Sequence, residues 1–299
     1  MLDENAVSKE IPVVFQCHES TMLGIVHQPQ QISTMGVLLV VGGPQYRVGS
    51  HRQFVLLARA LAKQGTPVLR FDYRGMGDAE DEIRTFDLVD EDIAAAIACF
   101  YQTCPELTGI VIWGLCDAAS AALFYAYQDD RVKGLVLLNP WVFTEQGAAK
   151  TYLKHYYWQR LTNPDLWRKI LSFKFNYAKS LFALVNLIKK ILGGQGSVEQ
   201  KPATAGKAVL VDSKLALPIR MRECLNRFQH PVLLILSGKD LTAEEFKGVV
   251  NADESWQALL AKESVTRHDL KEADHTFSSA LWRNQVEDWT VAWVQNLSR

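Results

Sequence analysis

The sequence predicts an α/β protein in which a mostly parallel central sheet is covered by helices on both faces. From Gly36 onward, apolar runs of strand length alternate with longer segments whose apolar residues recur every three or four positions. The runs are continuously apolar, which is typical of strands buried on both faces of a parallel sheet. Functional residues in this class follow the carboxyl ends of the strands, so we expect them in the loops there.

The individual elements follow from the same patterns. The expected parallel strands are Val37–Val41, Val68–Phe71, Gly109–Trp113, Leu135–Leu138 and Val232–Leu236, with helices over His51–Gln64, Phe86–Thr103 and Asp117–Gln128. Before them, the short apolar runs Ile11–Cys17 and Thr21–His27 predict an antiparallel hairpin. After them we expect a helical stretch over Thr242–Leu260, a strand over Ser264–Leu270, and a last helix, Ser278–Leu297, that turns Leu281, Trp282, Val286, Trp289, Trp293 and Val294 inward.

Length, charge and cysteine content narrow the class of protein. The chain has 299 residues, which is enough for one large domain with or without an inserted subdomain. Its formal net charge of −1 gives no reason to expect a nucleic-acid partner. The five cysteines are odd in number and lack a C-x-x-C spacing, which argues against a disulfide framework or a zinc site. We therefore expect no metal, no cofactor and a cytoplasmic location.

The termini and apolar runs give no sign of targeting or membrane insertion. The first fifteen positions carry early acids and no long apolar segment, so we expect no signal peptide. No run approaches the roughly 18 to 20 apolar residues that a membrane-spanning helix needs.

A basic, aromatic segment interrupts the α/β pattern after Leu138. Positions 150–190 hold nine Lys or Arg residues against one acid, Asp165, with Tyr157 and Trp158 among the aromatic residues between them. We interpret 141–222 as an inserted helical lid between core segments 1–140 and 223–299. Two interpretations of the basic residues stay open: a solvated face on structural helices, or a surface that attracts a phosphate-bearing carrier or an anionic inner-membrane surface.

The stretch Gly109–Ala122 predicts a buried strand that runs straight into a helix, with Cys116 at the bend. Gly-Leu-Cys-Asp-Ala has the form of a nucleophile elbow, G-x-S-x-G, with cysteine for serine and Ala118 for the last glycine. Small residues are needed beside the nucleophile because the backbone is strained and the strand and helix approach closely. The alternative is a buried core cysteine, which is common for this residue type.

The glycine-rich loop after Val41 is a candidate for the second half of an oxyanion hole. Its main-chain N–H would face that of Asp117 across the nucleophile, and because Pro44 has no N–H the donor would be Gly43 or Gln45. A simple strand-to-helix connection is the alternative. Ser50, three positions before a glutamine, fits a capping box for the next helix. The candidate substrate contacts are Tyr46, Arg47, Trp141, Tyr157 and Trp158.

The loop from Asp72 to Asp78 follows the next strand and holds two glycines among alternating charges. We interpret it as structural support near the site rather than as a direct participant in chemistry. Arg74 and Asp72 could pair with each other or with main chain.

Cys116, Asp240 and His275 stand in the chain order nucleophile, acid, base. Asp240 follows a late strand and His275 lies on the loop before the last helix, so each has the context that its role requires. Asp274 is a close competitor for the acid, although a residue seldom points at the ring of its immediate neighbour.

These motifs resemble a known family over nearly the whole chain. They are the glycine loop at Gly42, D-x-R-G-x-G at Asp72–Gly77, the elbow at Cys116, G-x-D at Gly238–Asp240 and A-D-H-T-F at Ala273–Phe277. Together they look like α/β-hydrolases of the serine-aminopeptidase and monoacylglycerol-lipase type. More narrowly, GGPQYRVGSHRQF and GLCDAASAAL resemble the type 1 hydrolases associated with exosortase A systems, which implies an exopolysaccharide and protein-sorting context.

The sequence also departs from the common pattern of that family. It has cysteine for serine, Gly42-Gly43-Pro44 for His-Gly-x, and Asp78 where serine is frequent. Polyhydroxyalkanoate synthases and dienelactone hydrolases resemble this chain in using an elbow cysteine, the former for acyl transfer and the latter for hydrolysis.

Three functions follow as hypotheses. The first is an acyl-group hydrolase of the esterase or thioesterase type, acting on a small-molecule or carrier-linked acyl substrate through a Cys-His-Asp triad and a thioester intermediate. The second is an acyltransferase from a thioester donor to a saccharide or amine. The third is a non-catalytic binding protein with a hydrolase fold, against which the intact triad argues.

Overall fold

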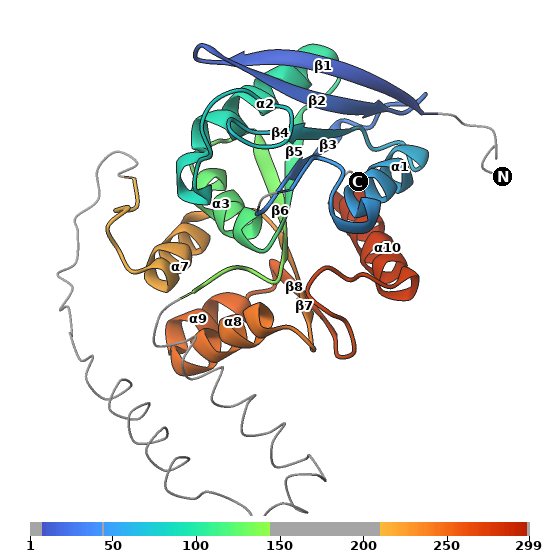
Figure 1. Ribbon diagram of the computed structural model, residues 1–299. Coiled ribbons are helices and arrows are strands. Elements are labelled where there is room, and N and C mark those ends of the chain that lie inside the picture. The colour runs from blue at the N-terminus through green and yellow to red at the C-terminus, as the bar shows by residue number, and fades with distance from the viewer. Residues whose placement is uncertain (1–7, 44, 144–209, 298–299) are drawn as a thin grey trace, which may run out of the picture. The chain divides into compact units, whose positions relative to one another are not determined.

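A computed structural model describes residues 8–43, 45–143 and 210–297 (Figure 1). The strands are β1 (Lys9–Cys17), β2 (Ser20–Gln28), β3 (Met35–Val40), β4 (Val68–Asp72), β5 (Gly109–Leu115), β6 (Val132–Leu138), β7 (Val232–Ser237) and β8 (Val265–Leu270). The α-helices are α1 (Gln53–Lys63), α2 (Asp90–Thr103), α3 (Asp117–Ala126), α7 (Leu217–Arg227), α8 (Leu241–Ala252), α9 (Glu254–Leu260) and α10 (Ala280–Leu297). Short 3₁₀ helices, η1 (Ser50–Arg52) and η2 (Phe86–Leu88), precede α1 and α2.

All eight strands form one sheet in the order β1-β2-β4-β3-β5-β6-β7-β8. The hairpin β1–β2 is antiparallel, β2 pairs antiparallel with β4, and every pairing from β4 through β3 to β8 is parallel. The predicted fold class, including the opening hairpin, is confirmed. The parallel arrangement brings the carboxyl ends of β3, β5, β6 and β7 to one edge, where the loops from Gly42, Cys116, Asn139 and Gly238 begin.

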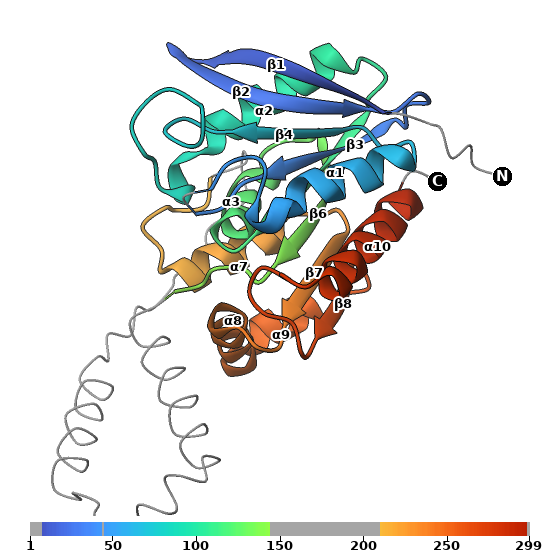
Figure 2. The same cartoon turned by 45° about the vertical axis from the view of Figure 1, so that its right-hand side comes forward.

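The two faces of the sheet carry separate apolar cores because successive side chains of a strand point to opposite sides. On β3, for example, Val37 and Leu39 belong to the core under α1 and α10, whereas Leu38 and Val40 belong to the core under α2 and α3. Figures 1 and 2 show α1 and α10 side by side on one face of the sheet and α2 and α3 on the other. This division explains why the strands are continuously apolar in sequence.

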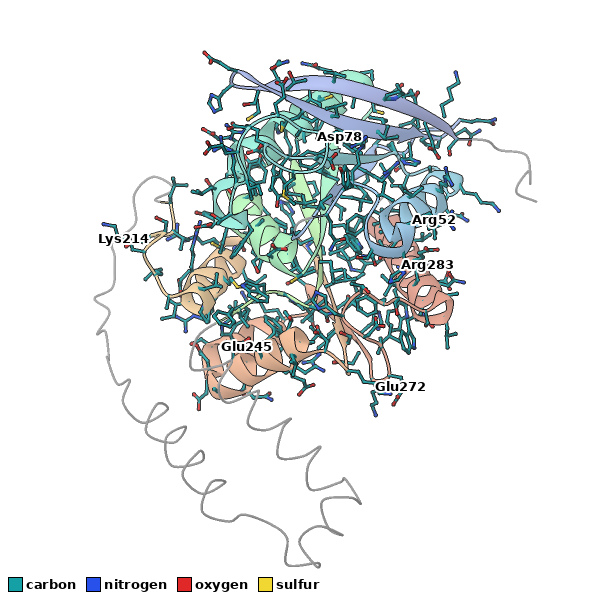
Figure 3. All side chains as sticks on the ribbon, viewed as in Figure 1. Arg52, Asp78, Lys214, Glu245, Glu272 and Arg283 are labelled. Atoms are coloured by element: carbon teal, nitrogen blue, oxygen red, sulfur yellow. The ribbon has the colours of Figure 1, made fainter. Side chains whose placement is uncertain are left out.

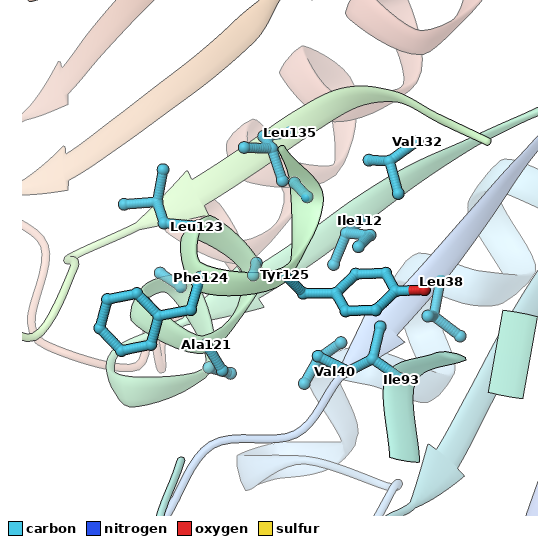
Figure 4. Close-up of a cluster of buried hydrophobic side chains, with 14 of the residues drawn as sticks. Leu38, Val40, Ile93, Ile112, Ala121, Leu123, Phe124, Tyr125, Val132 and Leu135 are labelled. Atoms are coloured by element: carbon cyan, nitrogen blue, oxygen red, sulfur yellow. The ribbon is translucent and has the colours of Figure 1, made fainter. Parts of the chain in front are cut away.

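Helix α3 lies closely on the sheet. Its residues from Ala118 to Ala126 are all buried, and Leu123, Phe124 and Tyr125 pack with residues such as Ile112 on β5 (Figure 4). An added Cβ at Gly114 would come within 2.6 Å of the Ala118 carbonyl group and 2.8 Å of the Ala119 nitrogen. Glycine at 114 is therefore required by the distance between strand and helix, as the elbow motif predicts.

The core resumes earlier than predicted. The described residues up to Val142 and from Leu210 onward form one compact unit, so α7 belongs to it and not to an insert that ends at 222. Met221, Cys224 and Leu225 of α7 are buried in the apolar core with α3, which explains the earlier boundary. The predicted lid helices fall largely on 144–209 and lie outside the described residues.

The stretch Thr242–Leu260 is helical as predicted, but it forms two helices, because the Asp253 side chain accepts the N–H of Ser255 and begins α9 there. Two other local predictions are wrong. Leu281 on α10 is 77% exposed rather than turned inward.

Ser50 does not form the capping box. Its N–H and hydroxyl both donate to the Gln45 side-chain oxygen, at 3.1 and 3.2 Å, and α1 begins only at Gln53. His51 and Arg52 have positive φ angles of 52° and 61°, so the chain kinks and turns Ser50 toward the preceding loop instead of the helix.

Charged side chains such as Arg52, Asp78, Lys214 and Glu272 are exposed (Figure 3). Across the described ranges 8–43, 45–143 and 210–297, we find no helix with the length and apolar character that crossing a bilayer requires.

Candidate active site

Cys116 occupies a strained turn between β5 and α3. Its φ and ψ are 63° and −125°, a conformation that non-glycine residues rarely adopt and that usually marks a functional position. Three main-chain hydrogen bonds hold it: the Cys116 N–H donates to the Leu138 carbonyl at 2.9 Å, and the Cys116 carbonyl accepts the N–H groups of Ala119 at 3.1 Å and Trp141 at 3.2 Å. The thiol is half-buried, whereas Cys17, Cys99, Cys104 and Cys224 are buried. The turn has the geometry of a nucleophile elbow.

His275 lies next to this thiol. Its Nδ1–H donates to Asp240 Oδ2 at 2.9 Å, which leaves Nε2 for the hydrogen bond that the ring makes with Cys116. These two bonds, that with Asp240 foremost, raise the pKa of His275 to about 10, although burial opposes them. At neutral pH the ring holds a proton that Nε2 can donate to sulfur or to a leaving group. The three residues proposed from chain order are thus in contact.

Asp240 both orients the histidine and begins a helix. Its carboxylate is 6% exposed and accepts the N–H groups of Thr242 and Ala243, each at 3.1 Å, at the N-terminus of α8. The competing acid, Asp274, accepts the N–H of Ser278 at 2.9 Å and also bonds to its hydroxyl. The N-terminus of α8 fixes the Asp240 carboxylate in place, whereas the Asp274 carboxylate is bonded to Ser278 in its own loop.

Asn139 positions the histidine loop, a role that the sequence patterns missed. It is fully buried with a positive φ of 42°; its Nδ2 donates to the His275 carbonyl at 3.0 Å, and its Oδ1 accepts the Ser237 N–H at 2.9 Å. The side chain ties the end of β6 to the end of β7 and to the loop of His275. The one signal in the sequence is a polar residue directly after a buried strand, in Leu138-Asn139-Pro140.

The glycine-rich loop reaches the elbow, and both of its candidate donors are engaged. The Gly43 N–H donates to Asp117 Oδ2 at 3.0 Å, and the Gln45 N–H donates to the Gly43 carbonyl at 2.8 Å. Asp117 Oδ1 accepts the Ala118 N–H at 3.0 Å. Burial raises the pKa of Asp117, while the N–H groups that it accepts and the charge of His275 oppose the increase.

Charged residues from β4 and the loop after it hold the glycine-rich loop in place. Asp72 accepts the Arg47 N–H at 2.6 Å and the Asp78 N–H at 3.1 Å, and Arg70 Nη1 donates to the Arg47 carbonyl at 2.8 Å. The Arg47 guanidinium pairs with both carboxylates, Asp72 and Asp78. The Asp72 loop therefore supports the glycine-rich loop.

Arg74 pairs elsewhere than with Asp72. Its Nε and Nη2 donate to the Asp92 carboxylate, each at 2.9 Å, and its own N–H donates to the same group. Hence Asp72 is free to hold the Arg47 loop while Arg74 is attached to α2.

An apolar cavity of about 370 Å³ opens at Cys116. Its lining residues are Gly42, Gly43, Gln45, Phe54, Phe86, Leu115, Cys116, Asp117, Trp141 and His275. Trp141, a predicted substrate contact, is among them. Tyr46 and Arg47 are not: Tyr46 is 55% exposed and Arg47 pairs with carboxylates. Tyr157 and Trp158 lie outside the described residues.

No group of three or more His, Cys, Asp or Glu side chains is arranged to hold a metal ion among residues 8–43, 45–143 and 210–297.

Solved structures resemble this chain along nearly its whole length. The Pyrococcus furiosus esterase Pf2001 has a TM-score of 0.63 and 15% identity, covering 97% of this chain and 93% of its own. Est1E from Butyrivibrio proteoclasticus, solved with ferulic acid bound, has a TM-score of 0.60 and 13% identity, with coverages of 95% and 98%. A dienelactone hydrolase from Anabaena variabilis has a TM-score of 0.59 and 14% identity, covering 97% of this chain and 98% of its own. At these identities the likeness is one of fold.

A search of curated proteins returned no significant match. A family model described as alpha/beta hydrolase fold matches residues 37–276, from β3 to the loop that carries His275. Because this match covers most of the sequence and includes Cys116, Asp240 and His275, the chain belongs to the alpha/beta hydrolase fold family.

Proposed function

We propose that this protein is an acyl-group hydrolase that cleaves an ester or thioester through a covalent intermediate on Cys116. The observation that carries the proposal is the contact of three groups: Cys116 in a strained turn, His275 bonded to it, and Asp240 holding the far side of the ring. Cys116 and His275 face an apolar cavity large enough for a small acyl group.

Acylation uses Cys116 and His275. The sulfur attacks the carbonyl carbon, a C–S bond forms, and the π electron pair moves to the carbonyl oxygen; a thiol proton, where present, passes to Nε2 of His275. Collapse of this intermediate breaks the bond to the leaving alcohol or thiol, which takes the proton from Nε2. Asp240 keeps Nδ1 protonated throughout and stabilises the imidazolium.

Deacylation uses the same histidine in the opposite order. Nε2 accepts a proton from water while the water oxygen attacks the thioester carbon, and the C–S bond then breaks to release the acid and restore the sulfur. In both steps the oxyanion would accept main-chain N–H groups, those of Asp117 and Gly43. Removing one donor of this kind typically costs about 2.7–4 kcal/mol of transition-state stabilisation.

The names of the structural neighbours agree with an ester substrate, although their identities of 13–15% support only the fold. The first neighbour is called an esterase, the second is Est1E, which was solved with ferulic acid bound, and the third is called a dienelactone hydrolase. The proposal for this chain rests on its own residues.

Intact-mass spectrometry tests the proposal. After incubation with activated esters and acyl thioesters, the full-length protein should gain the mass of one acyl group, and Cys116→Ala should gain none. Cys99→Ala, which removes a buried thiol on α2, should still be acylated. An adduct on the Cys116→Ala variant would overturn the assignment of the nucleophile.

The same experiment separates the other two functions. An adduct that is hydrolysed slowly until an alcohol or amine is added would replace hydrolysis by acyl transfer. No adduct from any donor would favour a non-catalytic binding protein.

The narrower resemblance to exosortase-associated type 1 hydrolases supports a proposed context in bacterial exopolysaccharide metabolism. Genes for exosortase and polysaccharide assembly beside the gene of this protein would agree with it, and an unrelated neighbourhood would contradict it. The five cysteines without a paired spacing support a cytoplasmic enzyme, and the basic positions 150–190 support its contact with an anionic carrier or membrane surface. Binding to anionic vesicles that does not weaken with salt would exclude an electrostatic contact.

A further inference from the structure

The carboxylate of Asp117 turns back onto the main-chain N–H groups around the elbow. Oδ2 accepts the Gly43 N–H at 3.0 Å and Oδ1 accepts the Ala118 N–H at 3.0 Å, while the N–H of Asp117 itself also interacts with the group. The side chain lines the cavity beside Cys116 and His275. One carboxylate thus gathers donors from the glycine-rich loop and from the start of α3.

These donors are the ones that the proposed reaction needs. An oxyanion formed at Cys116 would accept N–H groups of Asp117 and Gly43, and the other loop candidate, Gln45, already donates to Gly43. A carboxylate oxygen and an oxyanion cannot share one N–H at full strength, and two negative charges a few ångströms apart repel each other. The carboxylate must therefore leave the Gly43 N–H before the transition state forms.

Main-chain N–H groups and the space at Gly42 hold the carboxylate in this position. A Cβ on Gly42 would lie 2.3 Å from Asp117 Oδ1, so the absence of a side chain there makes room for the group. The charge of His275 attracts the Asp117 carboxylate. Burial raises the pKa of Tyr73, and the charge of the Asp117 carboxylate raises it further. Its main attachments are therefore the N–H groups.

We propose that the Asp117 carboxylate is an internal stand-in for the oxyanion, which occupies the oxyanion hole in the resting protein and is displaced by the acyl carbonyl group. This inference rests on the proposed function, because it concerns the hole that serves acyl chemistry at Cys116. The contact preserves the geometry of the loop and the elbow between turnovers. It also lowers the rate of acylation, because only the fraction of molecules with a vacant hole can react productively.

The test compares two reactions of the same thiol. Acylation by a p-nitrophenyl ester passes through an oxyanion, whereas alkylation by iodoacetamide does not. Both are followed by intact mass at a pH where alkylation has reached its plateau, so that a change in the thiolate fraction does not enter the ratio of the two rates. In Asp117→Ala this ratio should rise about ten- to hundredfold, the factor that corresponds to one hydrogen bond to a charged group.

Two further variants make the result specific. Asp117→Asn keeps the shape and an acceptor oxygen but loses the charge, so its ratio should rise by less than that of Asp117→Ala. Asp87→Asn removes a carboxylate that is exposed next to Phe86 of the cavity wall, and its ratio should equal that of the wild type.

The outcomes separate this inference from the proposed function. If the ratio of acylation to alkylation rates in Asp117→Ala stays within twofold of the wild-type ratio, or falls, the Asp117 carboxylate does not block the oxyanion hole. Asp117 then has a supporting or participating role. If the ester acylates Cys116 in neither the wild type nor any variant, while iodoacetamide still alkylates it, the proposed function is overturned instead.

Discussion

At the scale of the residue, Cys116 is the proposed nucleophile and has a strained backbone. A side chain at φ 63° and ψ −125° costs about 1–3 kcal/mol, and the main-chain bonds to Leu138 and Trp141 keep it there. The strain projects the thiol toward His275. The position of the sulfur atom therefore comes with a loss of stability.

This strain predicts an unusual order of stability. Cys116→Gly should be more stable than Cys116→Ala by about 1 kcal/mol, because glycine adopts this conformation freely and the relief exceeds its extra unfolded-state entropy of about 0.5–1 kcal/mol. Urea unfolding monitored by tryptophan fluorescence measures the difference. If alanine proves the more stable substitution, the turn is not strained.

A second residue-scale prediction concerns Asp240. Asp240→Asn should keep the start of α8, since asparagine is an equally good N-cap. It should lower kcat by about 10²–10⁴-fold, because an amide neither stabilises the imidazolium nor holds Nδ1 protonated. Steady-state kinetics with an activated ester, together with thermal unfolding, separates the two roles. A larger loss in Asp274→Asn would transfer the role of acid to Asp274.

At the scale of the element, the close approach of β5 and α3 determines where Cys116 lies. Gly114→Ala should destabilise the protein by about 1–3 kcal/mol, because the new Cβ meets backbone atoms of Ala118 that cannot move alone. Gly248→Ala on α8 is the matched control: nothing lies within 4 Å of its added Cβ, so it should stabilise by about 0.5–1 kcal/mol. Chemical denaturation of both variants measures the contrast, which equal effects would contradict.

At the scale of the whole molecule, two histidines give stability opposite dependences on pH. Burial and the nearby Arg70 lower the pKa of His27 to about 4, and Arg70 Nε donates to its neutral ring at 2.8 Å. The unfolded chain therefore binds more protons at this residue between about pH 4 and 6.5, and stability rises with pH there. His275, with its pKa raised to about 10, acts in the other direction.

The contribution of His275 is fully present below its unfolded pKa of about 6.5 and is lost as pH rises toward 10. We therefore expect stability to be highest near pH 6.5 as far as these two residues determine it. Urea unfolding from pH 4.5 to 9.5 should show a weaker alkaline decline in His275→Gln and a weaker acid rise in His27→Gln. Unchanged slopes in both variants would show that other groups control the pH dependence.

Local patterns were sufficient for the order of strands and helices along the chain and for naming the three candidate catalytic residues. Cys116, Asp240 and His275 each carry a local signature, a residue directly after a buried strand or on the loop before the last helix. Continuous apolar runs report burial on both faces because neighbouring side chains point to opposite sides of a strand. The sheet class and the candidate nucleophile are thus determined by the sequence itself.

Partners across long sequence separations were decided only by the tertiary structure. The Gly43–Asp117 and Asn139–His275 bonds join residues 74 and 136 positions apart, and the Asp72 carboxylate selects Arg47 rather than the nearby Arg74. Such choices depend on which loops the sheet brings to one edge and on the direction of each side chain there, and no periodicity along the chain encodes them. Cys116 could therefore be proposed from the sequence, whereas the contacts of the Asp117 carboxylate with Gly43 and Ala118 became visible only in the fold.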